Sequence, residues 1–369
     1  MRQWESVKSN FAWFCVNAGS EKHLIEEVKI IFPSWRLAYS RSGMVTFKML
    51  EALTFLQTFS KTPFFSFARR WGINLFHGNF DLVAQFLKDN GPFFQVHIWE
   101  QELLGFQDEK IESLVEILAH AGSQKINQPA ERGPLIQVMR IDREEFWINL
   151  QMIGANHILG ISGGQNGLNT QEFSQWISPP ISRAYYKMQN SWSIINPQER
   201  LGHWLELGCA PGGAVQFLLE QGNKVTGVDP GKMDERLASY IGQNCVEKNP
   251  PKFHFIESST QDVSKKMIFE TFGNVDWLAV DMNLSIKQSL SFSERIIADF
   301  PSIKGIIYTF KISHPNMIRD ISLLQKRLFW FGFSYQQSFQ WPSHRKEFLQ
   351  VALRKKNFTT ILPKDLSNV

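Results

Sequence analysis

The sequence is poor in cysteine. Its three cysteines, Cys15, Cys209 and Cys245, are odd in number and far apart in the chain. Neither a disulfide framework nor a zinc-binding spacing can be built from them, and such thiols fit a reducing compartment. We therefore expect a cytoplasmic protein without a metal site.

Long apolar runs are also missing. The stretch TPFFSFARRWG (62–72) is rich in aromatic residues but too short and too charged to cross a bilayer. The first residues, MRQWESVKSNFAWF, lack the basic start and apolar core of a signal peptide. We find no internal repeat and no low-complexity tract, so we expect no membrane partner.

The composition and the net charge are those of a globular protein. The chain has 369 residues, of which 43% are hydrophobic and 20% charged, with a formal net charge of +4. This length predicts two or three domains. A weak positive charge permits a nucleic-acid partner through a local basic surface but does not require one.

The sequence pattern of the N-terminal part of the chain predicts an α+β region. Residues 11–19 and 44–49 are strand-like, whereas 20–32, capped by Ser20, and 51–59 are helix-like. Further strands and helices are predicted at the end of this region: a strand over 92–102, a helix over 108–122, and a hairpin of 134–141 with 145–154. The stretch ISGGQNGLN (161–169) is rich in Gly and Asn and is the best linker candidate.

The back part alternates strands and helices regularly. Apolar strands are predicted over 204–208, 224–229, 253–258, 275–282 and 305–313, followed by a helix over 316–331 and strands over 333–341 and 347–355. Such alternation indicates a mainly parallel sheet with helices on both faces, an α/β doubly wound fold. The predicted boundaries are an N-terminal region over 1–162, a linker over 163–180, an α/β domain over 181–358 and a tail over 359–369.

One stretch of the α/β domain indicates a ligand site. Residues 205–231 read LELGCAPGGAVQFLLEQGNKVTGVDPG, a strand, a glycine-rich turn, a helix and a second strand that ends at Asp229. Ligands bind at this switch point in such sheets, and a carboxylate there can accept hydrogen bonds from ribose hydroxyls. The spacing matches neither the dinucleotide motif nor a P-loop. A ribose contact without a phosphate cradle suits S-adenosylmethionine better than NAD or ATP.

These motifs resemble those of a known family. LGCAPGG followed by VTGVDPG is similar to the cofactor motifs of the FtsJ/RrmJ-type ribose 2′-O-methyltransferases. The resemblance implies a Rossmann-like methyltransferase domain with a mostly parallel seven-stranded sheet. It also implies a catalytic tetrad, and the segments SRAYYK, VDWLAVDMN, IIYTFKIS and HRKEFLQVALRK supply its members in family order: Lys187, Asp281, Lys311 and Glu347.

Each tetrad member also has a structural explanation. Lys187 lies on a helix whose apolar stripe would be Ile181, Ala184, Met188 and Trp192, so its pattern alone favours an exposed position. Glu347 follows basic residues and alone would be a surface ion-pair partner. Asp281 and Lys311 end apolar strands, at the edge where α/β active sites collect. The four together favour the catalytic explanation.

The reaction explains these residue types. A ribose 2′-hydroxyl must lose its proton as it attacks a sulfonium methyl group, and a neutral lysine can accept that proton. An ordinary lysine has a pKa of about 10.4, which a nearby ammonium and burial lower. The resemblance implies that Lys311 is the base, that Lys187 and Asp281 orient the hydroxyl, and that Glu347 holds the lysines.

The resemblance also implies the cofactor contacts. The expected S-adenosylmethionine-binding residues cluster around the glycine-rich turn and the strand ends: Ala184, Gly208, Ala210, Pro211, Gly212, Gly213, Asp229, Ser259 and Asp281. Two positions depart from the family. Ser259 stands where an aspartate is usual, with Asp262 as a substitute, and Ala214 stands where close relatives often have tryptophan.

The front region resembles that of the large-subunit ribosomal RNA enzymes of this family. The segments FAWFCVNAGSEKHLIEEV and KTPFFSFARRW carry this resemblance, which implies a THUMP-like RNA-binding module and methylation of an rRNA cytidine. Arginines and tryptophans at 35, 36, 41 and 69–71 could contact phosphates and stack on bases. The oligomeric state stays open.

Other functions remain as alternatives. Methylation of a base nitrogen is disfavoured because the sequence DMNL stands where such enzymes have an [ND]-P-P-[YF] motif. Methylation of cytosine C5 is disfavoured because it needs a nucleophilic cysteine near the fourth or fifth strand, and no cysteine lies there. A non-catalytic RNA-binding assembly factor, or a 2′-O-methyltransferase of another RNA, would fit the same fold.

Overall fold

The chain divides into two compact units. Unit 1 comprises Met1–Gly167 with Leu362–Val369, and unit 2 comprises Leu168–Ile361. The computed structural model describes residues 7–54, 65–100, 109–128, 133–153, 179–192, 195, 199–240, 252–312, 314–340, 344 and 346–354. Nearly all of the predicted linker (163–180), and the whole predicted tail (359–369), lie outside these described residues.

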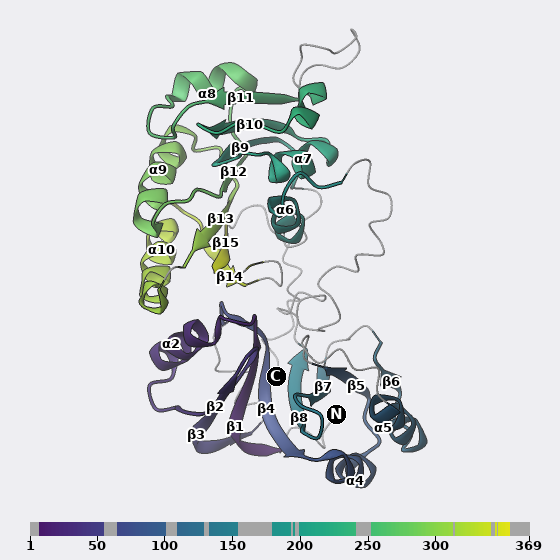
Figure 1. The fold of residues 1–369 in the computed structure, drawn as a ribbon. Helices are drawn as coiled ribbons and strands as arrows, with labels where there is room; N and C mark the ends of the chain where they lie inside the picture. The colour runs from purple at the N-terminus through teal and green to yellow at the C-terminus, as the bar shows by residue number, and fades with distance from the viewer. Residues whose placement is uncertain are drawn as a thin grey trace. The chain divides into compact units, whose positions relative to one another are not determined.

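The described part of unit 1 contains one eight-stranded sheet with the order β2-β3-β1-β4-β8-β7-β5-β6, packed with helices α2, α4 and α5 (Figure 1). Its elements, in chain order, are β1 (Lys8–Val16), α2 (Glu21–Ile31), β2 (Arg36–Arg41), β3 (Met44–Thr54), β4 (Ala68–Gly78), α4 (Phe80–Asn90), β5 (Gln95–Glu100), α5 (Glu109–His120), β6 (Lys125–Ile126), β7 (Gly133–Arg140) and β8 (Phe146–Ile153). The predicted α+β character and the β7–β8 hairpin are confirmed.

The sheet of unit 1 curls strongly. Strands β2 and β8 are separated in the sheet order by β3, β1 and β4. Even so, the Tyr39 ring centroid of β2 lies 5.9 Å from that of Trp147 in β8. The curled inner face encloses an apolar cluster that includes Trp13, Met44 and Met139. Consecutive residues are buried in β1 and β7, so these strands bury side chains on both faces, whereas β2 is exposed.

One prediction for unit 1 is wrong. Residues 51–59 were expected to form a helix, but β3 continues to Thr54, and residues 55–59 lie outside the described part of the chain. The pairing of Lys8 with Thr54 and of Ser9 with Leu53 extends the β1–β3 ladder past a bulge. Backbone pairing to β1 therefore overrides the local helical pattern.

The arginines and tryptophans expected to contact RNA do not form one surface. Arg70 is only 4% exposed; its guanidinium donates to Gln137 Oε1 at 2.8 Å and lies 4.2 Å from the Trp99 ring centroid. Trp35 is also buried and stacks on Phe32. Arg70 and Trp35 therefore belong to the core, whereas Arg36 is exposed.

Unit 2 contains a seven-stranded sheet with the order β11-β10-β9-β12-β13-β15-β14. Its described elements are α6 (Ala184–Trp192), β9 (His203–Leu207), α7 (Gly213–Glu220), β10 (Lys224–Asp229), the 3-10 helix η2 (Glu235–Tyr240), β11 (Phe253–Glu257), α8 (Lys265–Phe272), β12 (Trp277–Val280), α9 (Ile286–Asp299), β13 (Gly305–Lys311), the 3-10 helix η3 (Pro315–Ile318), α10 (Arg319–Trp330), β14 (Tyr335–Phe339) and β15 (Glu347–Leu353).

The topology of unit 2 confirms the predicted fold class. Strands β11, β10, β9, β12 and β13 are parallel, and β15 pairs antiparallel with both β13 and β14. Helices α6 and α7 cover one face of the sheet, and α8, α9 and α10 cover the other (Figure 1). This is a Rossmann-like α/β arrangement.

The centre of the unit 2 core is a stack of tryptophans. Trp204 in β9 lies opposite Trp277 in β12, and their ring centroids are 5.1 Å apart at 12°. Trp192 from α6 packs on Trp204 at 5.8 Å. Both buried indoles of the strand pair donate to backbone carbonyls, Trp204 to Arg200 and Trp277 to Glu199. The stack fixes α6 against the strands that carry the site.

A buried carboxyl in unit 1 makes stability depend on pH. Glu27 in α2 is 6% exposed and accepts hydrogen bonds from the backbone N–H groups of Ser66 and Phe67. Burial raises the pKa of Glu27 from 4.5 to about 7, and it outweighs the opposing effect of these hydrogen bonds. Between these values the folded state holds a proton that the unfolded state has lost, so stability falls as pH rises.

We expect Glu27→Gln to remove this dependence. From pH 4.5 to 7.5, the free energy of unfolding of wild-type unit 1 should fall relative to the variant by about 3 kcal/mol. Urea titrations of the full chain, read by proteolytic cleavage within residues 7–153, measure this difference. Parallel pH profiles for the two proteins would contradict it.

Candidate active site

Three of the predicted catalytic residues lie at one edge of the unit 2 sheet. Asp281 directly follows β12 and Lys311 is the last residue of β13. Because β15 runs antiparallel, its first residue, Glu347, lies at the same edge, directly opposite Lys311. The carboxyl edge of the parallel strands therefore holds two carboxylates and a lysine.

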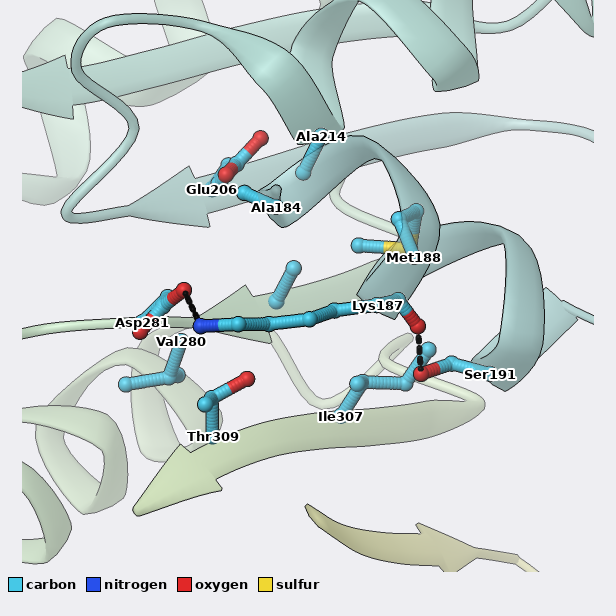
Figure 2. Close-up of a pocket in the computed structure, with 11 residues that line it drawn as sticks. Ala184, Lys187, Met188, Ser191, Glu206, Ala214, Val280, Asp281, Ile307 and Thr309 are labelled. Carbon is cyan, nitrogen blue, oxygen red and sulfur yellow. Dashed lines mark hydrogen bonds and ion pairs between the residues drawn. The ribbon is translucent and has the colours of Figure 1, made fainter. Parts of the chain in front are cut away.

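The fourth predicted residue, Lys187, reaches this edge from α6 (Figure 2). Its Nζ lies 3.0 Å from Asp281 Oδ2 and 2.9 Å from Glu347 Oε1. The Lys187 side chain is 10% exposed, so its ammonium is buried between the two carboxylates. The pattern-based expectation of an exposed lysine is wrong here, because α6 turns this side chain toward the strand ends.

Lys311 completes the cluster at longer range. Its Nζ lies 3.9 Å from Asp281 Oδ1 and 4.0 Å from Glu347 Oε2. The Lys311 side chain is 45% exposed, far more than those of Lys187, Asp281 and Glu347. Among the four groups, Lys311 is thus the one that a substrate can reach most easily.

Helix α6 is held in place by α7. The Ile181 N–H donates to Gln216 Oε1, and the Tyr185 hydroxyl donates to Glu220 Oε2. A Cβ at Gly213 would lie 2.2 Å from Ser182 Oγ and 3.0 Å from the Tyr185 nitrogen. The absence of a side chain at Gly213 therefore lets the segment that carries Ala184 and Lys187 pack against the first turn of α7.

The other glycines of the turn also have packing roles. Gly208 has a φ of +81°, and a Cβ there would lie 2.6 Å from the Asp281 carbonyl oxygen. Gly212 has a φ of +112°, and a Cβ there would lie 2.3 Å from Leu237. Both glycines therefore give room to neighbouring parts of the chain, and their contact with the cofactor stays a prediction.

Asp229 is fixed at the end of β10 by the turn itself. Its Oδ2 accepts a hydrogen bond from Ala210 N at 3.1 Å, and its Oδ1 accepts one from Gly231 N at 2.7 Å. Each carboxylate oxygen can accept a further hydrogen bond. Asp229 therefore presents a preoriented acceptor beside Ala210, Pro211 and Gly212.

The loop after β11 contains Ser259, one of the two positions that depart from the family's motifs. Ser259 is partly buried and its carbonyl accepts from Asp262 N at 3.0 Å, while Asp262 itself is exposed. Arg295 of α9 donates to the carbonyls of Thr260 and Gln261, which fixes this loop. Ala214, the other departure, is buried and lines a cavity beneath Lys187.

Sequence reasoning missed two buried titratable residues near this cluster. Glu206 in β9 is 2% exposed; burial raises its pKa well above the usual range, and Asp281 and Asp229 add to this effect. His344 is also buried, and burial, with the Lys187 charge, lowers its pKa to about 3. The acidic residue inside an apolar strand, WLELG, was the available signal for Glu206.

Within the described ranges, no group of three or more His, Cys, Asp or Glu residues is placed to hold a metal ion. None of the helices that the structure describes is long and apolar enough to cross a membrane.

Comparison with known families identifies the class of this unit. Residues 180–301 match the model of the FtsJ-like methyltransferase family, a match over about a third of the chain. No curated protein matches the chain. With the sheet topology and the strand-end cluster, the family match confirms a methyltransferase, with S-adenosylmethionine as its cofactor.

Solved structures give weaker likenesses. TrmN from Thermus thermophilus is 13% identical, with 93% of this chain and 99% of that chain covered and a TM-score of 0.33. A possible methylase from Clostridium difficile 630 is 9% identical, with 94% and 98% covered and a TM-score of 0.34. Magnesium protoporphyrin IX methyltransferase from Synechocystis PCC 6803 is 14% identical, with 47% and 80% covered and a TM-score of 0.33. Likenesses at these TM-scores support no conclusion about this chain.

The buried ion pairs predict a stability effect. Lys187→Met should leave Asp281 and Glu347 buried without their nearest cation, at a cost of about 3 kcal/mol in the free energy of unfolding of unit 2. Lys266 is the matched control because its side chain is 82% exposed and pairs with Glu270 at 3.7 Å. Lys266→Met should change stability by less than about 0.5 kcal/mol. Equal effects in urea unfolding would contradict the prediction.

Proposed function

We propose that this protein is an S-adenosylmethionine-dependent RNA ribose 2′-O-methyltransferase. The observation that carries the proposal is the convergence of Lys187, Asp281, Lys311 and Glu347 at one sheet edge, with every lysine–carboxylate separation in the cluster at 4.0 Å or less. Two lysines and two acids in contact suit a reaction that must orient a hydroxyl and remove its proton.

Lys311 is the proposed general base. It is the most exposed member, and its Nζ lies about a full ångström farther from the carboxylates than Lys187 Nζ does. Lys187, which donates to Asp281 Oδ2, and Asp281 would orient the 2′-hydroxyl. Glu347 bridges both lysines and would keep them in place. Since the bound cofactor supplies an activated methyl group, alignment contributes much of the remaining rate.

The cofactor would occupy the switch point formed by the glycine-rich turn and the ends of β9 and β10. The fixed Asp229 carboxylate has free acceptor capacity for the two ribose hydroxyls. The segment Ala210–Gly213 would lie along the methionine part. Ala184, Ser259 and Asp281 are the remaining proposed contacts, and the chemistry of this donor set fits a nucleoside without a phosphate.

The proposed substrate is large-subunit ribosomal RNA, with a cytidine as the modified nucleotide. The support is the sequence resemblance of the front region to the bacterial ribosomal RNA large-subunit methyltransferase M, in which a THUMP-like module holds the RNA. Unit 1 adds one physical feature: Arg36 in β2 and Lys48 in β3 lie directly opposite each other, and both are exposed. Like charges in this arrangement destabilise a sheet unless an anion such as a phosphate offsets them.

A non-catalytic RNA-binding assembly factor is the competing function. Such a factor would keep the fold and the cofactor pocket but would have no use for a lysine base. The enzyme would transfer the methyl group of the cofactor to RNA, whereas the assembly factor would not. An experiment with methyl-labelled cofactor therefore distinguishes the two hypotheses.

We expect Lys311→Met to lower kcat for RNA methylation by 10²- to 10⁴-fold, because the variant cannot accept the hydroxyl proton. Purified protein is mixed with methyl-labelled S-adenosylmethionine and rRNA from a strain that lacks the gene, and the label is mapped. Cofactor affinity should stay within about threefold of wild type.

Lys304→Met is the matched control for this experiment. Lys304 lies one residue before β13, at the opposite edge of the sheet, and pairs with Asp276 at 3.0 Å. The control should keep wild-type kcat. Label on a base, or full activity in Lys311→Met, would overturn the mechanism, and absence of label with every RNA despite cofactor binding would favour the assembly factor.

The cofactor site has its own test. Asp229→Asn should raise the Kd for S-adenosylmethionine at least about tenfold, since an amide has one acceptor oxygen for two backbone donors and the ribose hydroxyls. Calorimetry on the full chain measures this, with Glu270→Gln on the exposed surface of α8 as control. An unchanged Kd in Asp229→Asn would place the ribose elsewhere.

A further inference from the structure

A short segment after β10 lies on the glycine-rich turn. This segment, residues 230–240, is called the strap here and includes η2. Its Leu237 packs against Gly212, where a Cβ would lie 2.3 Å from Leu237 Cδ1. The Asp234 N–H donates to the Pro211 carbonyl oxygen at 2.9 Å. The strap is therefore fixed to the turn by both packing and a backbone hydrogen bond.

One side chain of the strap joins two parts of the chain. Arg236 Nε and Nη2 donate to Asp234 Oδ1 and Oδ2, both at 2.8 Å, which makes a bidentate ion pair. The third guanidinium nitrogen, Nη1, donates to the Pro179 carbonyl oxygen at 2.9 Å. A planar guanidinium can make both contacts at once because its donors point in fixed, different directions. Arg236 thus joins the strap to the segment that leads into α6.

The ion pair itself contributes little to folding. The side chains of Arg236 and Asp234 are 44% and 26% exposed, and exposed pairs of this kind add little stability. Hydrogen bonds from the Arg236 side chain and backbone lower the pKa of Asp234 from 3.8 to about 2, so its carboxylate stays ionised near neutral pH. Removal of the pair should therefore change the placement of the joined segments more than the stability of unit 2.

The segment that Arg236 holds leads to a residue of the proposed catalytic cluster. Pro179 lies shortly before α6, the helix that carries Lys187. Between them, the Ile181 N–H donates to a side chain of α7. A continuous path of contacts therefore runs from the glycine-rich turn through Asp234 and Arg236 to the start of α6.

We propose that Arg236 is a positioning residue that couples the cofactor site to Lys187. When the site at Ala210 and Asp229 is occupied, the turn and the strap become less mobile together. Arg236 passes this constraint to the segment before α6, and Lys187 is thereby aligned with the bound methyl donor. The effect on catalysis rests on the proposed methyltransferase function, whereas the coupling of the cofactor site to α6 does not.

The contacts at the two ends of Lys187 divide this task. Its ammonium is fixed by Asp281 and Glu347, and these ion pairs do not involve Arg236. The Arg236 contact instead restrains the backbone that leads into the helix. Since small errors in alignment are costly in rate, loss of this restraint should lower kcat moderately while the charged cluster stays in place.

The coupling is tested first by hydrogen–deuterium exchange on the full chain, without RNA. In wild type, S-adenosylmethionine should slow amide exchange in residues 208–213 and also in the first turn of α6. In Arg236→Met, the protection of 208–213 should remain and that of α6 should be lost. Lys266→Met, on the exposed surface of α8, is the control and should behave as wild type. If α6 is not protected in wild type, or is protected equally in Arg236→Met, the proposal is wrong.

Kinetics test the positioning role. Arg236→Met should lower kcat for RNA methylation about five- to tenfold. The Kd for S-adenosylmethionine should stay within about threefold, because the Asp234 backbone still holds Pro211. A merely structural loss would weaken cofactor binding as well. A raised Kd with kcat unchanged would therefore overturn the role.

A double variant locates the effect in the ion pair. Asp234→Ala removes the carboxylate but keeps the backbone donor to Pro211. If both side chains act through one contact, the variant with Asp234→Ala and Arg236→Met should have the kcat of Arg236→Met alone. Losses that multiply would mean that the two side chains act separately, against the proposal.

The test does not depend on one variant or on one activity. If Arg236→Met does not fold, Arg236→Gln, which lacks the guanidinium that joins Asp234 to Pro179, replaces it in each measurement. If wild type labels no RNA, the proposed function fails, while the exchange data still decide whether Arg236 couples the cofactor site to α6.

Discussion

The position of one ammonium group, Lys187 Nζ between Asp281 and Glu347, is the constraint on which the rest of the site depends. It joins α6 to the ends of β12 and β15, elements far apart in the sequence. Buried charges of both signs are stable only in this close pairing. The packing that brings α6 to the sheet, from the tryptophan stack to the contacts with α7, therefore decides whether the site exists.

Much of unit 2 could be predicted from the sequence because its strands are apolar runs with clear ends. Asp281, Lys311 and Glu347 mark those ends, and the geometry of a doubly wound sheet brings such positions to one edge. Lys187 could be found by the family motif but not by its pattern, since its burial depends on a tertiary contact of α6. Glu206 was only a single acidic residue inside an apolar strand, and its surroundings come from strands β12 and β13 and from two helices, α6 and α7.

Unit 1 was harder to predict, for a related reason. In its strands β1, β5 and β7 consecutive residues are buried, so the polar–apolar alternation that marks a half-exposed strand is lost there. Arg70 and Trp35 resembled a basic, aromatic surface in the sequence but are core residues in the structure. Residues 51–59 had a helical pattern, but Leu53 and Thr54 pair with β1, because ladder hydrogen bonds outweigh a short local preference.

The antiparallel β15 has a consequence for the order in which the protein acquires its parts. The proposed cofactor residues around Ala210 and Asp229 are made early in unit 2, whereas Glu347 is the first residue of its last strand. During synthesis, a chain that has reached α8 would contain the turn and the acceptor for the nucleoside but not the group that bridges both lysines. Because β15 lies between β13 and β14, the proposed catalytic cluster is complete only once this last strand has been inserted.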